Sequence, residues 1–230
     1  VEGAFDRRAA DTTDRVVAWL GERGSDRPFF LWVHYFDPHR PYVAPPAYRD
    51  RFLTQPEPSW REFNRARYDA EILYADEQLG RILDAWDASP HAKNGYIVLW
   101  SDHGYNLGEK GAWSKMKPWY DSAHSNLIIA GPGVQKGAVC NKAVSLQDLY
   151  PTLIDLLKIP APPQQIDGNS LVPLLKDPDA AWDRPVVMSS ESDGIRWDVV
   201  LDNDYRMTRL ITCETELYKL ADDPHEFNNL

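Results

Sequence analysis

The sequence has little cysteine, little positive charge and no long apolar run, and each shortage excludes a class of protein. Its 230 residues include two cysteines, Cys140 and Cys213, too few for a disulfide framework, although one bridge between them stays open. Lys and Arg number 25 against 35 Asp and Glu, and the net charge of −10 argues against non-specific binding to nucleic acid. The longest apolar runs, residues 29–33 and 96–100, have the length of a strand, whereas a membrane-spanning helix needs about 18–20 residues. No membrane span is therefore expected.

Other features are missing as well. The first residue is Val1 and no signal-peptide pattern follows it, so we expect the sequence to begin within a longer protein. There is no Gly-rich phosphate loop of the P-loop or dinucleotide type, which leaves nucleotide chemistry unsupported. What is present, 43% apolar residues and nine Trp, is the composition of a folded globular protein and excludes disorder.

Periodic apolar residues predict the helices. Residues 10–24 begin with capping candidates and continue with an apolar face at helical spacing. Residues 60–89 contain no Pro and repeat apolar residues at the same spacing, which predicts one long helix or two abutting helices. A further helix is expected over residues 145–159, capped by Ser145 and ended by Pro160.

Short apolar runs predict strands at residues 28–36, 96–101 and 127–130. The first run lacks polar alternation, as expected for a strand buried on both faces of a parallel sheet. The Pro-rich stretch that follows it, up to Pro58, predicts a long irregular loop. Helices alternating with strands indicate an α/β fold whose mostly parallel sheet is flanked by helices.

The pattern changes beyond Asp177. Residues 186–190, 198–201 and 206–212 are short β-rich pieces, which predict a small antiparallel C-terminal subdomain. We therefore divide the chain into an α/β portion, residues 1–178, and a β-rich portion, residues 179–230.

In open α/β sheets, ligands bind beyond the carboxyl ends of the strands, so the polar residues that follow the strands are the candidates for chemistry. Asp102 and His103 directly follow the second strand, and Gly104 permits a sharp turn there. A carboxylate and an imidazole at this point could both face one metal ion. On spacing alone, a turn with a surface acid and a hydrogen-bonded His is the simpler interpretation.

The first strand ends in a similar way. His39 lies between Pro38 and Pro41, which restrict the backbone and would hold the imidazole in one direction, a useful property in a proton donor. A rigid turn with an incidental His explains the pattern equally well.

The loop before the third strand is rich in lysine. Lys110, Lys115 and Lys117 could bind an oxyanion there, although most lysines are simply solvated. His124 follows in the same loop and is a substrate-binding candidate with the same alternative. Neither cysteine has a neighbouring His or basic run, so structural roles are favoured for both.

In combination, these motifs resemble the sulfatase family of the alkaline-phosphatase superfamily. The resemblance lies in the order of the motifs over nearly the whole chain rather than in any single one. The matching segments are residues 29–42, 68–83, 101–104, 107–109, 115, 131–133, 148–153, 167–175, 216–218 and 223–224.

The resemblance implies an incomplete alkaline-phosphatase-like fold and the hydrolysis of sulfate esters of a sugar or small organic molecule. It implies that Asp102 and His103 are ligands of a divalent cation, usually calcium, with His103 where many members carry Asn. It also implies that His39 contacts the sulfate or protonates the leaving oxygen. Lys115 would bind the sulfate ester, with Lys117 as the competing choice.

The departures from the family pattern concern the nucleophile. Members carry, in an N-terminal half, a Cys or Ser that is oxidised to formylglycine, and neither Cys140 nor Cys213 has the required sequence context. The paired N-terminal aspartates of the metal site are absent too, and Ser125-Asn126 stands where members have Val-Pro. The resemblance thus covers a C-terminal half, and we expect the N-terminal half as a partner, without which this chain is inactive.

Two alternatives remain open at this point. A phosphonate or phosphate ester hydrolase could use the same metal and lysine on the same scaffold. A non-catalytic truncated relative could act as a binding module. Because many members are exported, a periplasmic, secreted or lysosomal location is implied by the resemblance alone.

Overall fold

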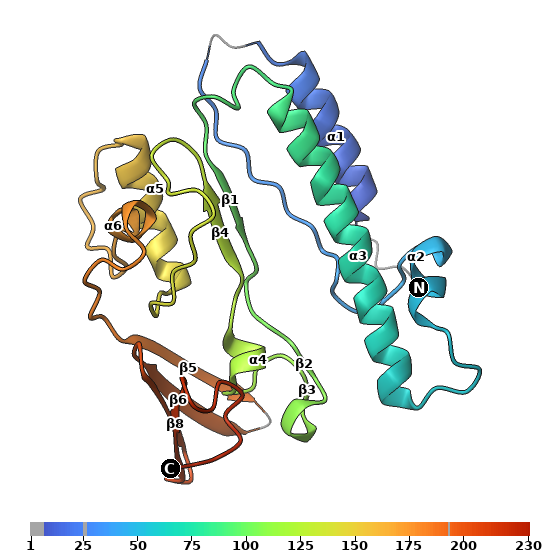
Figure 1. Cartoon of the computed structure of the whole chain (residues 1–230), viewed down its shortest axis with the longest axis vertical. Helices are drawn as coiled ribbons and strands as arrows, with labels where there is room; N and C mark the ends of the chain where they lie inside the picture. Colours follow the sequence, from blue (N-terminus) through green and yellow to red (C-terminus); the bar gives the residue numbers. More distant parts are fainter. Residues whose placement is uncertain (1–6, 25–26, 193) are drawn as a thin grey trace. The chain divides into compact units, whose positions relative to one another are not determined.

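The computed structural model describes residues 7–24, 27–192 and 194–230 (Figure 1). The chain forms two compact units, residues 1–95 and residues 96–230. The division expected at residue 178 lies inside the second unit and stays a prediction. In the described part of the chain, every helix is too short or too polar to cross a membrane.

Two long helices form the first unit. Helices α1 (Ala9–Glu22) and α3 (Trp60–Asp87) lie side by side (Figure 1) and bury Val16 and Tyr74, among other side chains. The Tyr74 hydroxyl accepts a hydrogen bond from the backbone of α1, and Arg81 of α3 pairs with Asp14 of α1 at 2.6 Å. The prediction over residues 60–89 is confirmed, with one continuous helix that begins at a capping box.

The Pro-rich stretch before α3 contains a helix as well. Helix α2 (Pro46–Phe52) packs on α3, so the prediction of a wholly irregular loop was wrong. Pro46 occupies the first turn of α2, where its missing N–H would have no intrahelical partner and its fixed φ suits the helix.

Residues 28–36 are extended but form no strand ladder with any other described segment. Phe30 is 68% exposed and Trp32 is 60% exposed, in contrast to the buried strand that the sequence predicts. An extended segment needs neighbours on both edges to pair its backbone and cover its side chains. All strand pairs of the described residues are antiparallel, so the parallel pairing predicted for this segment has no counterpart there.

A two-stranded ribbon organises the first part of the second unit. Strand β1 (Ile97–Trp100) pairs antiparallel with β4 (Leu127–Ala130), so that Trp100 lies opposite Leu127. Leu127 also packs against a buried cluster of Leu171, Leu174 and Trp182. The helical elements that follow β4 are η2 (Leu146–Asp148), α5 (Leu149–Leu157) and α6 (Val172–Lys176). The Ser145 cap predicted for this region is present as a capping box.

The C-terminal part of the second unit is a four-stranded antiparallel sheet, as predicted. Its strands are β5 (Val186–Ser192), β6 (Ile195–Leu201), β7 (Tyr205–Leu210) and β8 (Thr215–Lys219), hydrogen-bonded in that order. Trp197, Val199 and Tyr218 are buried. The sequence did not mark β8 as a strand, although part of it belongs to the 216–218 motif.

Candidate functional site

The connection between β1 and β4 carries Asp102, His103, Lys115 and His124. Two hydrogen bonds close it at its base: the Ser101 N–H donates to the Asn126 carbonyl at 3.2 Å, and the Asn126 N–H donates to Ser101 Oγ at 3.1 Å. We call residues 101–126 the excursion. It contains β2 (Asn106–Leu107), η1 (Glu109–Gly111), β3 (Trp113–Ser114) and α4 (Tyr120–Ala123).

The side chains of Asp102 and His103 place two electron-pair donor atoms close together. His103 Nδ1 lies 2.6 Å from the Gly104 carbonyl oxygen, and because a carbonyl only accepts, Nδ1 carries the proton. The neutral ring then has its lone pair at Nε2, which is 3.4 Å from Asp102 Oδ2. Two such donor atoms can both bind one cation. The Asp102 side chain is 83% exposed, so a cation can reach it from solvent. This donor set fits part of a divalent metal site.

The described residues supply no more than part of such a site. No group of three or more His, Cys, Asp or Glu side chains that could hold a metal forms within residues 7–24, 27–192 and 194–230. Both cysteines are free and exposed, so the open question of a disulfide is answered against one.

Gly104 allows the Asp102-His103 turn to pack directly on α4. The Gly104 N–H donates to the Ser122 carbonyl at 2.9 Å. A Cβ at this position would lie 2.2 Å from the Asp121 carbonyl oxygen and 2.6 Å from that of His124. Only glycine fits, and the close approach joins the Asp102-His103 turn to the segment that carries His124.

The three lysines of the excursion have different surroundings. Lys110 Nζ donates to the Glu226 carbonyl and to the Tyr218 hydroxyl, and it lies within 5.8 Å of the ring centroids of Trp119, Tyr218 and Phe227. We call these three rings the aromatic cage. An ammonium group held in this way by cation–π and hydrogen-bond contacts is a structural tie and is not free to bind an oxyanion.

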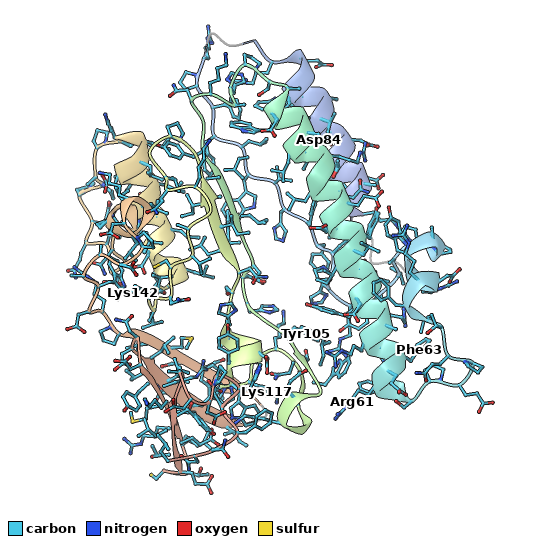
Figure 2. The ribbon with its side chains drawn as sticks, in the orientation of Figure 1. Arg61, Phe63, Asp84, Tyr105, Lys117 and Lys142 are labelled. Carbon is cyan, nitrogen blue, oxygen red and sulfur yellow. The ribbon has the colours of Figure 1, made fainter. Side chains whose placement is uncertain are left out.

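Lys115 differs from Lys110 in having no hydrogen-bond or ion-pair partner among the described residues. Its neighbours Ser114 and Met116 have φ values of 81° and 63°, in the left-handed region that non-glycine residues rarely adopt. Such backbone strain on both sides of a residue is frequent at functional sites. Lys117 follows in the loop between β3 and α4 (Figure 2), and its backbone N–H donates to Ser122 Oγ at 3.0 Å.

His124 follows α4 and stacks on Tyr120, with ring centroids 4.5 Å apart and an interplanar angle of 19°. Its backbone N–H donates to the Tyr120 carbonyl at 2.8 Å. Burial lowers the pKa of His124 first, and the positive charge of Arg206 lowers it further, whereas Asp121 opposes both effects. The neutral imidazole is therefore favoured at this position.

Arg206 and Glu226 form a buried ion pair that the sequence analysis missed. Arg206 Nε lies 3.0 Å from Glu226 Oε1, and the two side chains are 2% and 0% exposed. Arg206 also donates to the Pro118 carbonyl, and Glu226 Oε2 accepts from the Tyr120 N–H at 3.0 Å. The pair thereby connects β7 and the C-terminal tail to the excursion. The only sequence feature that could have pointed to this ion pair is that Glu226 follows the Asp223-Pro224 motif by two residues.

His39 belongs to the first unit and caps a tight turn. Its N–H donates to the Phe36 carbonyl at 2.9 Å, and its ring lies 4.8 Å from the Phe36 ring. His39 Nδ1 is 2.8 Å from the Arg40 carbonyl, which fixes the proton on Nδ1 and leaves the lone pair of the neutral ring on Nε2. The imidazole is held in one direction, as the sequence predicts, with Nε2 as the atom able to exchange a proton.

The turn of His39 is held by acidic side chains at both ends. Asp37 Oδ2 accepts from the Ala9 N–H of α1 at 3.0 Å, and Glu71 of α3 accepts from the Val43 N–H. The Asp37 carboxyl group is close enough to Glu71 to act on its ionisation. Burial, reinforced by the neighbouring Asp37, raises the pKa of Glu71 to about 7. Sequence analysis did not single out Glu71, because an acid within a long helix is usually solvated.

Comparisons with known proteins identify the family of this chain. A family model described as "Sulfatase" matches residues 4–159, and one described as "N-sulphoglucosamine sulphohydrolase, C-terminal" matches residues 108–230. A sulfatase of Formosa agariphila is 30% identical to this chain over an aligned length of 253 residues. The alignment covers 94% of this chain and 49% of that protein. The chain belongs to the sulfatase family. It spans about half the length of the curated relatives it matches.

Solved structures confirm the alkaline-phosphatase-like fold. One, determined with its substrate D-glucosamine-2-N,6-O-disulfate, has a TM-score of 0.79 at 20% identity and covers 97% of this chain and 65% of that one. The phosphonate monoester hydrolase of Agrobacterium radiobacter has a TM-score of 0.77 at 23% identity, covering 100% of this chain and 58% of that one. At these identities the likeness concerns the fold.

Proposed function

We propose that the protein to which this chain belongs hydrolyses sulfate esters of a sugar or a small organic molecule. The observation that carries the proposal is the sulfatase family match over residues 4–159, a range that includes His39, Asp102, His103 and Lys115. The Lys115 ammonium, which has no partner among the residues that the structure describes, and the neighbouring donors of Asp102 and His103 suit the negative charge of a sulfate ester. The substrate in the glucosamine disulfate complex described above is consistent with a sulfated sugar.

The proposal gives each of these residues a role that its chemistry allows. Asp102 Oδ2 and His103 Nε2 would supply two of the ligands of a divalent cation, calcium by family resemblance. When bound, such a cation draws electron density from the sulfuryl oxygens. Lys115 would neutralise a second oxygen of the same group. His124, for which the neutral imidazole is favoured, would contact the substrate by hydrogen bonding rather than by charge.

His39 would complete the reaction. As the S–O bond to the alcohol breaks, its electron pair stays on the leaving oxygen, and the proton of a protonated His39 Nε2 would pass to that oxygen. The nucleophile that attacks sulfur would be a formylglycine outside this chain, because neither cysteine has the motif context. The chain alone is therefore expected to be inactive.

The test compares the 230-residue chain with a longer protein that also contains a formylglycine motif. Each is assayed with aryl esters of sulfate, phosphate and phosphonate. Turnover of the sulfate ester by the longer protein alone supports the proposal, and sulfatase turnover by the 230-residue chain contradicts it. A preference for phosphonate or phosphate would support the alternative hydrolase, and inactivity of the longer protein on all three esters would support a non-catalytic module.

A further inference from the structure

The buried Arg206–Glu226 pair also makes hydrogen bonds to backbone groups outside its own sheet. Removing both charges from water carries a large desolvation penalty, and well-packed apolar residues of the same volume stabilise a core equally well or better. A structural explanation therefore accounts poorly for the pair. What distinguishes it is where its remaining hydrogen bonds go: to the Pro118 carbonyl and the Tyr120 N–H, both in the excursion.

Resting on the proposed function, we infer that Arg206 and Glu226 are positioning residues for substrate binding. They hold the backbone at Pro118 and Tyr120, and thereby hold the His124 ring in the orientation that meets the anionic ester. The sheet and tail act through the excursion and not by touching the substrate.

The contacts between the pair and His124 are continuous. Glu226 accepts from the Tyr120 N–H, the Tyr120 carbonyl accepts from the His124 N–H, and the Tyr120 ring stacks on the His124 ring. Lys110, in its aromatic cage, binds the Glu226 carbonyl and ties the same tail a second time.

The charge of Arg206 also affects the protonation of the His124 imidazole. The charged groups that act on the His124 ring are Arg206, which favours the neutral imidazole, and Asp121, which opposes it. The Tyr120 hydroxyl, whose pKa burial raises, stays uncharged at neutral pH. Loss of the Arg206 charge and loosening of the excursion would both make protonation of His124 easier, so the two effects have the same sign.

The main test is the double variant Arg206→Met with Glu226→Gln. It removes both buried charges together, keeps their approximate volume and leaves no unpaired charge behind. Histidine NMR on the 230-residue chain, with the His124 signal assigned by His124→Gln, should show the midpoint of the His124 titration rising by about half a pH unit or more. In the longer, active protein, KM for an aryl sulfate should rise about tenfold with kcat changed less than about twofold.

A second variant, Tyr120→Leu, isolates the last link. It keeps the backbone N–H that Glu226 accepts and removes only the ring on which His124 stacks. It should reproduce the rise in KM, and it keeps the test decisive if the double variant fails to fold. The matched control is Asp222→Asn, which breaks the exposed Lys219–Asp222 pair at the end of β8 and should change neither quantity.

An unchanged His124 titration together with an unchanged KM in a folded double variant would overturn the inference, as would a wild-type KM in Tyr120→Leu. Both outcomes leave the proposed function intact, provided that the wild-type longer protein turns over the sulfate ester. If it does not, the proposed function fails, and the NMR measurement still decides whether the pair positions His124.

Discussion

The Glu71 side chain of α3 lies close to the Asp37 side chain at the start of the His39 turn, and the nearby carboxyl group of Asp37 disfavours the ionisation of Glu71. A carboxyl pair of this kind is stable when one member keeps its proton. Burial and Asp37 raise the pKa of Glu71 to about 7 from its ordinary 4.5, so Glu71 is the protonated member over much of the physiological range.

The first prediction is a pH dependence of stability. Because the pKa of Glu71 is higher in the folded state, that state binds more protons, and the contribution of Glu71 is complete below pH 4.5 and lost as the pH rises toward 7. Glu71→Gln, whose amide can still donate to Asp37 and accept from Val43, should remove this fall in Tm and be more stable than the wild type at pH 8. Thermal melting between pH 4.5 and 8 measures it.

The control for this prediction is Asp84→Asn, an exposed carboxylate near the other end of the same helix (Figure 2). It should follow the wild-type pH dependence. Parallel pH profiles for Glu71→Gln and the wild type would show that Glu71 does not hold a proton in the folded protein.

The second prediction concerns Gly104. Gly104→Ala places a Cβ against two carbonyl oxygens of the α4 segment, and the resulting overpacking should destabilise the second unit by about 1–3 kcal/mol. The matched control is Gly80→Ala inside α3, where a Cβ meets no atom within 4 Å and the helix should gain about 0.5–1 kcal/mol. Urea denaturation of both variants measures the difference. A Gly104→Ala variant as stable as the wild type would show that the turn has room for a Cβ at position 104.

The third prediction separates the lysines. Lys115→Ala should lower kcat/KM of the longer protein about 100-fold with Tm unchanged, because an ammonium that only the substrate uses contributes nothing to folding. Lys110→Met should lower Tm, because it empties the aromatic cage and frees the Glu226 carbonyl. Lys136→Ala, an exposed control, should change neither quantity. A Lys115 variant with full activity would shift the role to Lys117.

The fourth prediction concerns the cation. Asp102→Ala removes one of the two converging donors and should weaken metal binding about 10–100-fold, measured by calorimetry with Ca²⁺ and with Mn²⁺. Both ions are used because calcium prefers oxygen ligands, whereas the His103 imidazole suits a transition metal. Asp84→Asn is again the control. Unchanged affinity for both ions and unchanged activity would contradict the metal role.

Local patterns predict the local parts of the fold. The apolar spacing of residues 60–89 and the Ser145 cap give elements that form largely from their own residues, and both are confirmed. Helix α2 was missed because Pro46 was treated as a helix breaker, although proline suits a first helical turn. The buried strand expected at residues 28–36 depends on neighbours that the described residues do not supply.

The family resemblance favoured Lys115 among the lysines, with Lys117 as the competing choice, but sequence alone did not reveal how Lys110 is held. The aromatic cage around Lys110, two of whose rings come from the C-terminal region, is a tertiary feature. Glu71 and Arg206 are charged residues in ordinary helix and strand patterns. Their burial is a tertiary property, so no local signal could reveal it.

The two hydrogen bonds between Ser101 and Asn126 have a consequence for how members of this family can diverge. Because the base of the excursion is closed there, the register of β1 with β4 does not depend on how many residues lie between them. Insertions, deletions or grafts inside the excursion can therefore change what the protein recognises without realigning the strands beneath. Length changes within residues 102–125 that spare Asp102, His103, Lys115 and His124 are therefore expected to leave the pairing of β1 with β4 unchanged.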